Sequence, residues 1–156
     1  MILSFSTAWK SISVAAVLLV MSIGQAFALQ DRAAISSHLE FLGYSIEDLK
    51  DEGVRASHPT YFNAQFRDYR GGILVSLYFT AKAKASEDRL GFHEVVNTLN
   101  QAAIAARYYV DDDDNLRVEA YYPGTYERQR FATFLTSWND ITAQIRSTQE
   151  VLQYVE

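Results

Sequence analysis

The chain has 156 residues, 49% of them hydrophobic and 13% aromatic, and it contains no cysteine. This length suits one domain with a packed core, and the absence of cysteine excludes disulfide bonds, thiol catalysis and cysteine-bound zinc. The formal net charge of −5 argues against nucleic acid and anionic membrane surfaces as partners.

Residues 1–28 have the pattern of a secretory signal peptide. An apolar run from Ile12 to Ile23 follows Lys10, and Ala26-Phe27-Ala28 places small residues where a signal peptidase reads them. The run is shorter than the ~20 apolar residues of a spanning helix. We therefore expect cleavage between Ala28 and Leu29, no stable membrane insertion after cleavage, and a periplasmic or secreted bacterial protein. An uncleaved membrane anchor is the alternative.

The expected mature chain, residues 29–156, begins with a helix and a short strand. Ile35, Leu39 and Leu42 recur at helical spacing from residue 31 onward, and Gly43 suits the residue that ends a helix. The polar segment 49–54 predicts one short edge strand. The rest of the chain then reads as a single α+β domain.

A β-hairpin followed by a second helix occupies residues 61–100. Phe62, Ala64 and Phe66 alternate with polar residues, Gly71-Gly72 predicts the turn, and residues 73–79 return as a strand. This second strand is apolar on nearly both faces, so we place it centrally in a sheet. Residues 81–85 indicate a strand end or connector, and Ser86 is expected to begin the helix.

Residues 107–110 and 116–122 predict a second hairpin around the acidic loop 111–115. Four consecutive aspartates suggest calcium, but with Asp111 as the first ligand an EF-hand would need Gly at Leu116 and Glu at Tyr122. A solvated turn rich in Asp and Asn explains the loop better, so no metal site is predicted.

A long C-terminal helix is expected from Glu127 onward. A largely apolar stripe recurs there in steps of three and four, namely Phe131, Phe134, Trp138, Ile141, Ile145, Thr148, Leu152 and Val155. Large aromatic side chains favour packing across a sheet over a coiled-coil seam. The stripe thins beyond Arg146, so this end is expected to be dispensable for folding and free to reach a second subunit.

The predicted fold class is therefore α+β. A mostly antiparallel sheet of two hairpins plus a short edge strand would carry helices on one side, the last of them long. His38, His58 and His93 have no catalytic motif around them, and no phosphate loop, dinucleotide fingerprint or nucleophile elbow occurs. We expect no catalytic residues, no cofactor and no enzymatic activity.

Several local patterns together resemble the YbjN family of bacterial sensory transduction regulators. They are Leu42-Gly43-Tyr44, the apolar hairpin, Val96-Asn97-Thr98-Leu99-Asn100, and the acidic turn leading to Leu116-Arg117-Val118-Glu119. The resemblance covers about residues 33–145. It implies a fold similar to type III secretion chaperones, which often form homodimers and bind extended segments of other proteins. It supplies no catalytic residue.

Asn97 and Asn100 lie three residues apart near one helix face, and each can bond both donors and acceptors. They are candidates either for tying the helix to a strand edge or turn, or for contacting a partner. The leading functional hypothesis is an exported, non-enzymatic protein that binds a protein or peptide. The alternative is a small cone-shaped α+β enzyme or ligand-binding protein, which would need a cavity lined by convergent ionisable residues.

Overall fold

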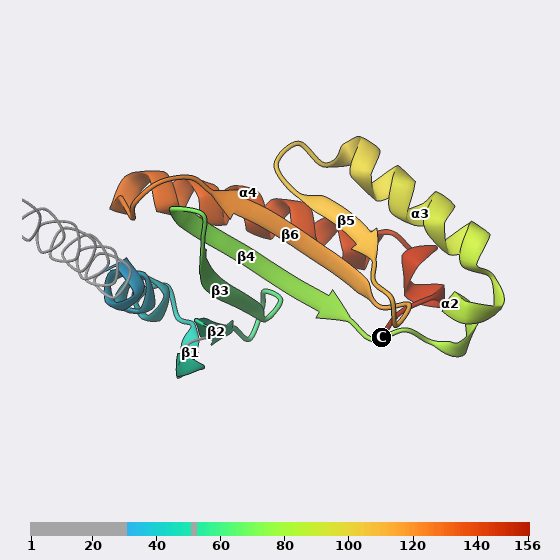
Figure 1. Ribbon diagram of the computed structural model, residues 1–156, viewed down its shortest axis with the longest axis horizontal. Coiled ribbons are helices and arrows are strands. Elements are labelled where there is room, and N and C mark those ends of the chain that lie inside the picture. Colours follow the sequence, from blue (N-terminus) through green and yellow to red (C-terminus); the bar gives the residue numbers. More distant parts are fainter. Residues whose placement is uncertain (1–30, 51–52) are drawn as a thin grey trace, which may run out of the picture.

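The computed structural model describes residues 31–50 and 53–156 (Figure 1). Six strands form one antiparallel sheet in the order β1-β2-β3-β4-β6-β5. The strands are β1 (Ser45–Asp48), β2 (Val54–Ser57), β3 (Ala64–Tyr69), β4 (Gly72–Phe79), β5 (Arg107–Val110) and β6 (Leu116–Tyr122).

The helices pack against one face of this sheet, which we call the core face. They are a helix over residues 31–41, α2 (Ala83–Glu87), α3 (Arg89–Ala102), α4 (Arg128–Ser147) and the short 3-10 helix η2 (Val151–Gln153). Figure 1 shows α4 running lengthwise along the sheet and α3 beside β5. The α+β fold predicted from the sequence is confirmed.

The core lies between the core face and α4. Ile73, Val75 and Leu77 alternate along β4 toward the helices, as Leu116, Val118 and Tyr122 do along β6. α4 buries a stripe against them, made of Phe131, Leu135, Trp138, Ile141 and Ile145. The expectation that this helix packs across its own sheet is therefore confirmed. The described core residues fall within 35–155, so a chain beginning at Leu29 contains all of them.

Both predicted hairpins form, and β4 occupies an interior position in the sheet. The first strand pair differs from the prediction, because residues 45–57 make two strands rather than one edge strand. Gly53 permits this extra turn at φ +101, where a Cβ atom would lie 2.0 Å from the Phe66 carbonyl oxygen.

The segment before α3 also differs from the prediction. Residues 83–87 form α2 instead of a connector, and the helical path breaks at Asp88, with φ −132 and ψ 60. The Asp88 carboxylate accepts a hydrogen bond from the Gly91 N–H at 3.1 Å. It therefore starts α3 three residues later than the predicted start at Ser86.

The prediction for the C-terminal segment was wrong. α4 ends at Ser147, and the chain reverses so that Val151, Tyr154 and Val155 are buried. The Lys82 N–H donates to the Tyr154 carbonyl at 2.8 Å, and Val155 forms a β-bridge with Ala81. A continued helix would rise about 1.5 Å per residue past the sheet and expose these side chains, whereas the reversal buries them.

The predicted signal peptide and its cleavage position between Ala28 and Leu29 lie outside the described residues. Within residues 31–50 and 53–156, no helix combines the length and apolar composition needed to cross a bilayer.

Candidate functional site: the open face of the sheet

The sheet face opposite the helices carries a grid of aromatic and charged side chains. We call it the open face. Strand alternation and register place on it Glu47, Arg55, Gln65, Arg67, Tyr69, Leu74, Ser76, Tyr78, Arg107, Tyr109, Arg117, Glu119 and Tyr121. Tyr78 is 61% exposed and Tyr121 is 41% exposed. Uncovered aromatic side chains grouped on one face are typical of an interaction surface.

One polar row crosses all six strands of the open face. In strand order it consists of Glu47, Arg55, Gln65, Ser76, Glu119 and Arg107. Ion pairs form at both ends: Arg55 Nη1 lies 2.8 Å from Glu47 Oε2, and Arg107 Nε donates to Glu119 Oε2 at 3.0 Å. The row therefore holds its own charges in place across the sheet.

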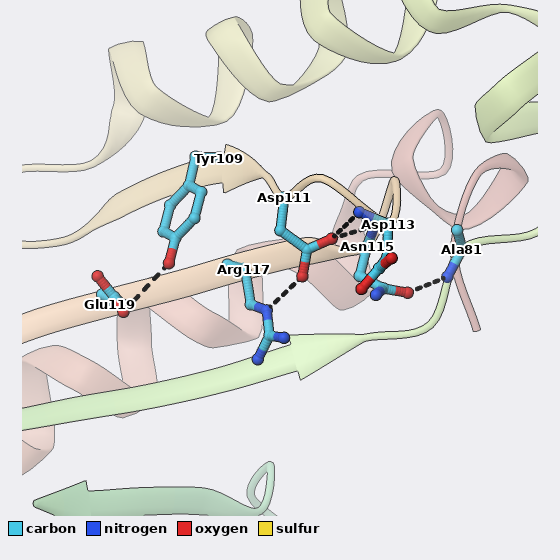
Figure 2. Close-up of polar contacts among 7 residues, drawn as sticks. All are labelled: Ala81, Tyr109, Asp111, Asp113, Asn115, Arg117 and Glu119. Atoms are coloured by element: carbon cyan, nitrogen blue, oxygen red, sulfur yellow. Dashed lines mark hydrogen bonds and ion pairs between the residues drawn. The ribbon is translucent and has the colours of Figure 1, made fainter.

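Glu119 is the buried acid of this row, and it organises the β5–β6 end. Its other carboxylate oxygen accepts a hydrogen bond from the Tyr109 hydroxyl at 3.2 Å (Figure 2). The hydrogen bonds to Glu119 raise the pKa of the Arg107 guanidinium. Burial, and next the Glu119 charge, raise the pKa of Tyr109. Tyr109 therefore stays a neutral donor and Arg107 a cation at physiological pH.

A second row interleaves an arginine with two tyrosines. Arg117 stands opposite Tyr78 on β4 and Tyr109 on β5. Its guanidinium carbon lies 4.8 Å from the centre of the Tyr78 ring, and its Nε donates to Asp111 Oδ2 at 2.6 Å. Figure 2 shows this side chain crossing from β6 toward β4, with its Nε facing the Asp111 carboxylate. The pairing fixes the arginine beside the exposed ring.

The acidic loop is a turn held by its own side chains. Asp111 Oδ1 accepts from the backbone N–H groups of Asp113 at 3.1 Å and Asn115 at 2.9 Å. Asn115 Oδ1 accepts from the Ala81 N–H at 3.0 Å (Figure 2). Among the described residues, no group of three or more His, Asp or Glu side chains could hold a metal ion. The Asp111 carboxylate thus serves the turn and Arg117.

Two hollows indent the open face at opposite ends of its central strands. The first, the Arg67 hollow, has a volume of about 560 Å³ and lies between the β3–β4 turn and the loop before β5. Its lining consists of Arg67, Tyr69, Arg70, Leu74, Ile104, Ala105, Ala106, Arg107, Glu119, Ala120 and Tyr121. The second, the Tyr78 hollow, has a volume of about 460 Å³. It is lined by Arg55, Asn63, Ala64, Gln65, Ser76, Leu77, Tyr78, Thr80, Arg117 and Glu156.

Asn100 joins α3 to the outer edge of β5. Its Nδ2 donates to the Tyr108 carbonyl at 2.8 Å, and its Oδ1 accepts from the Tyr108 N–H at 2.9 Å. The amide occupies the positions that a neighbouring strand would take, which corresponds to the structural role considered for this residue. Asn97 is exposed, and no hydrogen bond from its side chain is found in the described chain.

Tyr108 is anchored on its other side as well. Its hydroxyl donates to the Ile141 carbonyl of α4 at 2.9 Å, and burial raises the pKa of Tyr108 to about 12. The edge strand is therefore fixed to both α3 and α4.

The three histidines have separate environments. His38 is buried with its Nδ1 3.0 Å from the Tyr126 hydroxyl oxygen, and burial lowers its pKa. His58 Nδ1 accepts from the Thr60 N–H at 3.0 Å, and His93 is exposed on α3. The contacts found in the described chain do not bring these side chains into one site.

The comparison with protein families agrees with this architecture. The YbjN family model, described as "Putative bacterial sensory transduction regulator", matches residues 31–149. The chain belongs to the YbjN family. The resemblance inferred over about residues 33–145 is therefore confirmed.

A solved structure has the same fold as this YbjN-family chain. It is the crystal structure of YbjN from E. coli, described as a putative transcription regulator, which superposes with a TM-score of 0.58 at 15% sequence identity. The match covers 80% of this chain and 94% of that one. A comparison with curated proteins gave no match.

Sequence reasoning predicted helices on one side of the sheet of this YbjN-family chain, but it did not list the side chains that gather on the other side, although a signal for them exists. Arg117, Glu119 and Tyr121 alternate with core residues along β6. Along β3, Gln65 and Arg67 alternate with the buried Ala64 and Phe66, and Tyr69 continues the same spacing. The alternation shows that these side chains share a face with one another. It does not show how these side chains meet across neighbouring strands, because that depends on the strand order and register of the sheet.

Proposed function

We propose that this YbjN-family chain is an exported, non-enzymatic regulatory module that binds a protein partner through its open face. The observation that supports it is the six-stranded sheet with exposed tyrosines and arginines on the side that no described helix covers. Aromatic side chains and arginine are the residue types enriched at protein interfaces. The family description as a sensory transduction regulator supports a regulatory rather than a metabolic role.

The side chains of the face suit this role better than the β5 edge does. A partner strand added to β5 would need the Tyr108 N–H and C=O groups, and both already bond to Asn100. On the open face, by contrast, Tyr69 and Tyr78 are 40% and 61% exposed. We therefore place the partner across the face. Chaperone-like binding of an extended segment, which the family resemblance implies, would use the same surface.

The alternative, a cone-shaped enzyme or ligand-binding protein, has less support. The buried polar residues of the described chain are His38, Glu119 and Thr142. His38 lies beside Tyr126, Glu119 belongs to the open face, and Thr142 bonds to its own helix at 2.9 Å. Such scattered groups do not converge on a substrate.

Export is part of the proposal and rests on the N-terminal sequence pattern. Mass spectrometry of the protein isolated from its native host should give Leu29 as the first residue. Recovery of a chain that begins at Met1 from washed membranes would contradict export by cleavage and favour the anchor.

Affinity capture with matched variants tests the binding face. Tagged residues 29–156 serve as bait in a periplasmic extract, beside Tyr69→Ala/Tyr78→Ala and the control Phe41→Ala/Leu90→Ala, with folding of each bait checked by circular dichroism. Phe41 and Leu90 are 76% and 74% exposed on the helices, so the control also removes two large exposed side chains.

We expect the wild type and the control to retain the same partner and the tyrosine variant to lose it. Equal retention by all three baits would contradict the open face as the site. Light scattering of the purified protein identifies the case in which the partner is a second copy of this chain.

A further inference from the structure

We propose that the Arg67 hollow binds an acidic, extended segment of the partner, with a carboxylate held between Arg67 and Arg70. This inference rests on the proposed function, and it adds the chemical class of the ligand. It is carried by the distribution of charge, by the apolar lining and by the shape of the open face.

The arginines of the open face and its turn divide into two groups. Arg55, Arg107 and Arg117 each pair with a carboxylate, at 2.8, 3.0 and 2.6 Å respectively. Arg67 and Arg70 form no ion pair with any carboxylate in residues 31–50 and 53–156. Arg70 instead lies 5.2 Å from the centre of the Tyr69 ring. A chain with net charge −5 thus places at one hollow two guanidinium groups that no carboxylate of the described residues compensates.

The same hollow offers apolar contacts beside these charges. Leu74 of β4, which is 7% exposed, stands opposite Arg67 of β3 and opposite Tyr121 of β6. Ile104 adds a side chain that is 98% exposed. The hollow therefore suits a carboxylate next to an aliphatic or aromatic side chain better than a free inorganic anion. Guanidinium groups recognise a carboxylate with two parallel hydrogen bonds.

The shape favours a peptide segment over a small molecule. Along β4, Leu74 in the Arg67 hollow and Tyr78 near the second hollow are separated by about 13 Å, at roughly 3.3 Å per strand residue. The polar row through Ser76 lies between them. An extended segment of about five residues spans both hollows at this rise.

The acids on the face disfavour a polyanion. Glu119 lines the Arg67 hollow, and Glu156 lines the Tyr78 hollow. A nucleic acid strand or an anionic bilayer would bring several phosphates against these carboxylates. A segment with one or two spaced acids can set its carboxylate against Arg67 and Arg70, while Glu119 in the same hollow is already paired with Arg107.

Selection from a random hexapeptide display library on immobilised residues 29–156 tests the ligand class. We expect the enriched sequences to carry Asp or Glu beside an apolar residue. The best synthetic peptide, measured by fluorescence anisotropy, should bind at least tenfold more tightly than its Gln or Asn counterpart. Its affinity should also fall as salt rises.

Arg67→Gln/Arg70→Asn locates the site. Asn tolerates the left-handed backbone at Arg70, where φ is 48, and Gln keeps the approximate length of Arg67. The matched control Arg128→Gln/Arg130→Gln removes the same charge from α4. We expect the first variant to weaken binding about tenfold or more, since each arginine contributes up to roughly fivefold. The Arg128→Gln/Arg130→Gln control should change the peptide affinity less than twofold.

Four outcomes overturn the inference: no enriched peptide, enrichment of neutral or basic sequences, equal affinity of the Gln or Asn counterpart, or equal weakening by the control. Binding to phosphatidylglycerol vesicles without peptide binding would replace the peptide with a membrane. If the partner capture succeeds through Tyr69 and Tyr78 while these tests fail, protein binding stands and only the acidic ligand is wrong. Acidic peptides bound without any captured partner would support this site and contradict the broader proposal.

Discussion

Deleting residues 148–156 should unfold the domain, because the C-terminal segment completes its core. Val151, Tyr154 and Val155 are 0%, 5% and 1% exposed. The Tyr154 ring stacks on Phe92 of α3 with 4.9 Å between ring centres. The deletion therefore exposes one end of α3 and of the sheet together.

The expected loss of stability follows from the buried side chains. Burying a side chain of this size stabilises a protein by about 1.5–3 kcal/mol, so three of them contribute roughly 5–9 kcal/mol. The deletion also removes the backbone hydrogen bonds from Lys82 to Tyr154 and from Glu156 to Thr80. A single domain has about 5–15 kcal/mol of unfolding free energy in total. The truncated chain should accordingly lack a cooperative transition.

Urea denaturation followed by far- and near-ultraviolet circular dichroism measures this loss. Val151→Ala should lower the free energy of unfolding by roughly 2 kcal/mol, from two lost methyl groups and the remaining cavity. Leu152→Ala is the matched control, because Leu152 is 37% exposed in the same turn, and its effect should stay within about 0.5 kcal/mol. A truncated protein that unfolds cooperatively at the urea concentration of the wild-type midpoint would refute the reasoning.

Three further perturbations test other parts of the fold. Asn100→Ala should lower the free energy of unfolding by roughly 1–3 kcal/mol, because it leaves the Tyr108 backbone groups unpaired. The control Asn97→Ala removes an exposed side chain and should lower it by less than about 0.5 kcal/mol. Equal losses would argue against the contact between Asn100 and the β5 edge. Millimolar calcium should leave the melting temperature unchanged, because the Asp111 carboxylate already accepts hydrogen bonds from the turn backbone and from Arg117. A large rise in melting temperature that Asp111→Asn abolishes would instead show a calcium site. Trp138→Ala should cost roughly 3–5 kcal/mol at any protein concentration, and a melting temperature that rises steeply with concentration would instead indicate an intermolecular helix.

The elements that the sequence predicted well are those whose signal is local. The β5–β6 hairpin has the bounds expected from its alternation, and residues 73–79 form an interior strand because they are apolar on both faces. Gly43, at φ +92, follows the first helix because the end of that helix needs a left-handed residue. In each case the residues that decide the structure lie within a few positions of one another.

The errors occurred where distant contacts compete with local pattern. Leu152 and Val155 continue the helical spacing of α4, so periodicity alone cannot show that the chain reverses at Thr148. The reversal is stabilised by Phe92 and by the end of β4, which are more than fifty residues away in the chain. Similarly, Asp88 interrupts a helical pattern because its carboxylate bonds to the Tyr154 hydroxyl at 2.8 Å as well as to Gly91.

The sequence by itself determined which side chains share a face of each strand, since alternation has a period of two. It thereby placed Arg67 with Tyr69 on one strand, and Arg117 with Glu119 and Tyr121 on another. The order of elements predicted helices on one side of the sheet, but only the tertiary structure decided that Arg67 and Arg70 line one hollow on the other side, without a carboxylate partner in the described chain. The physical reason is that the helices all bury their apolar stripes on the opposite face, and burial of apolar area acts across the whole chain rather than along it.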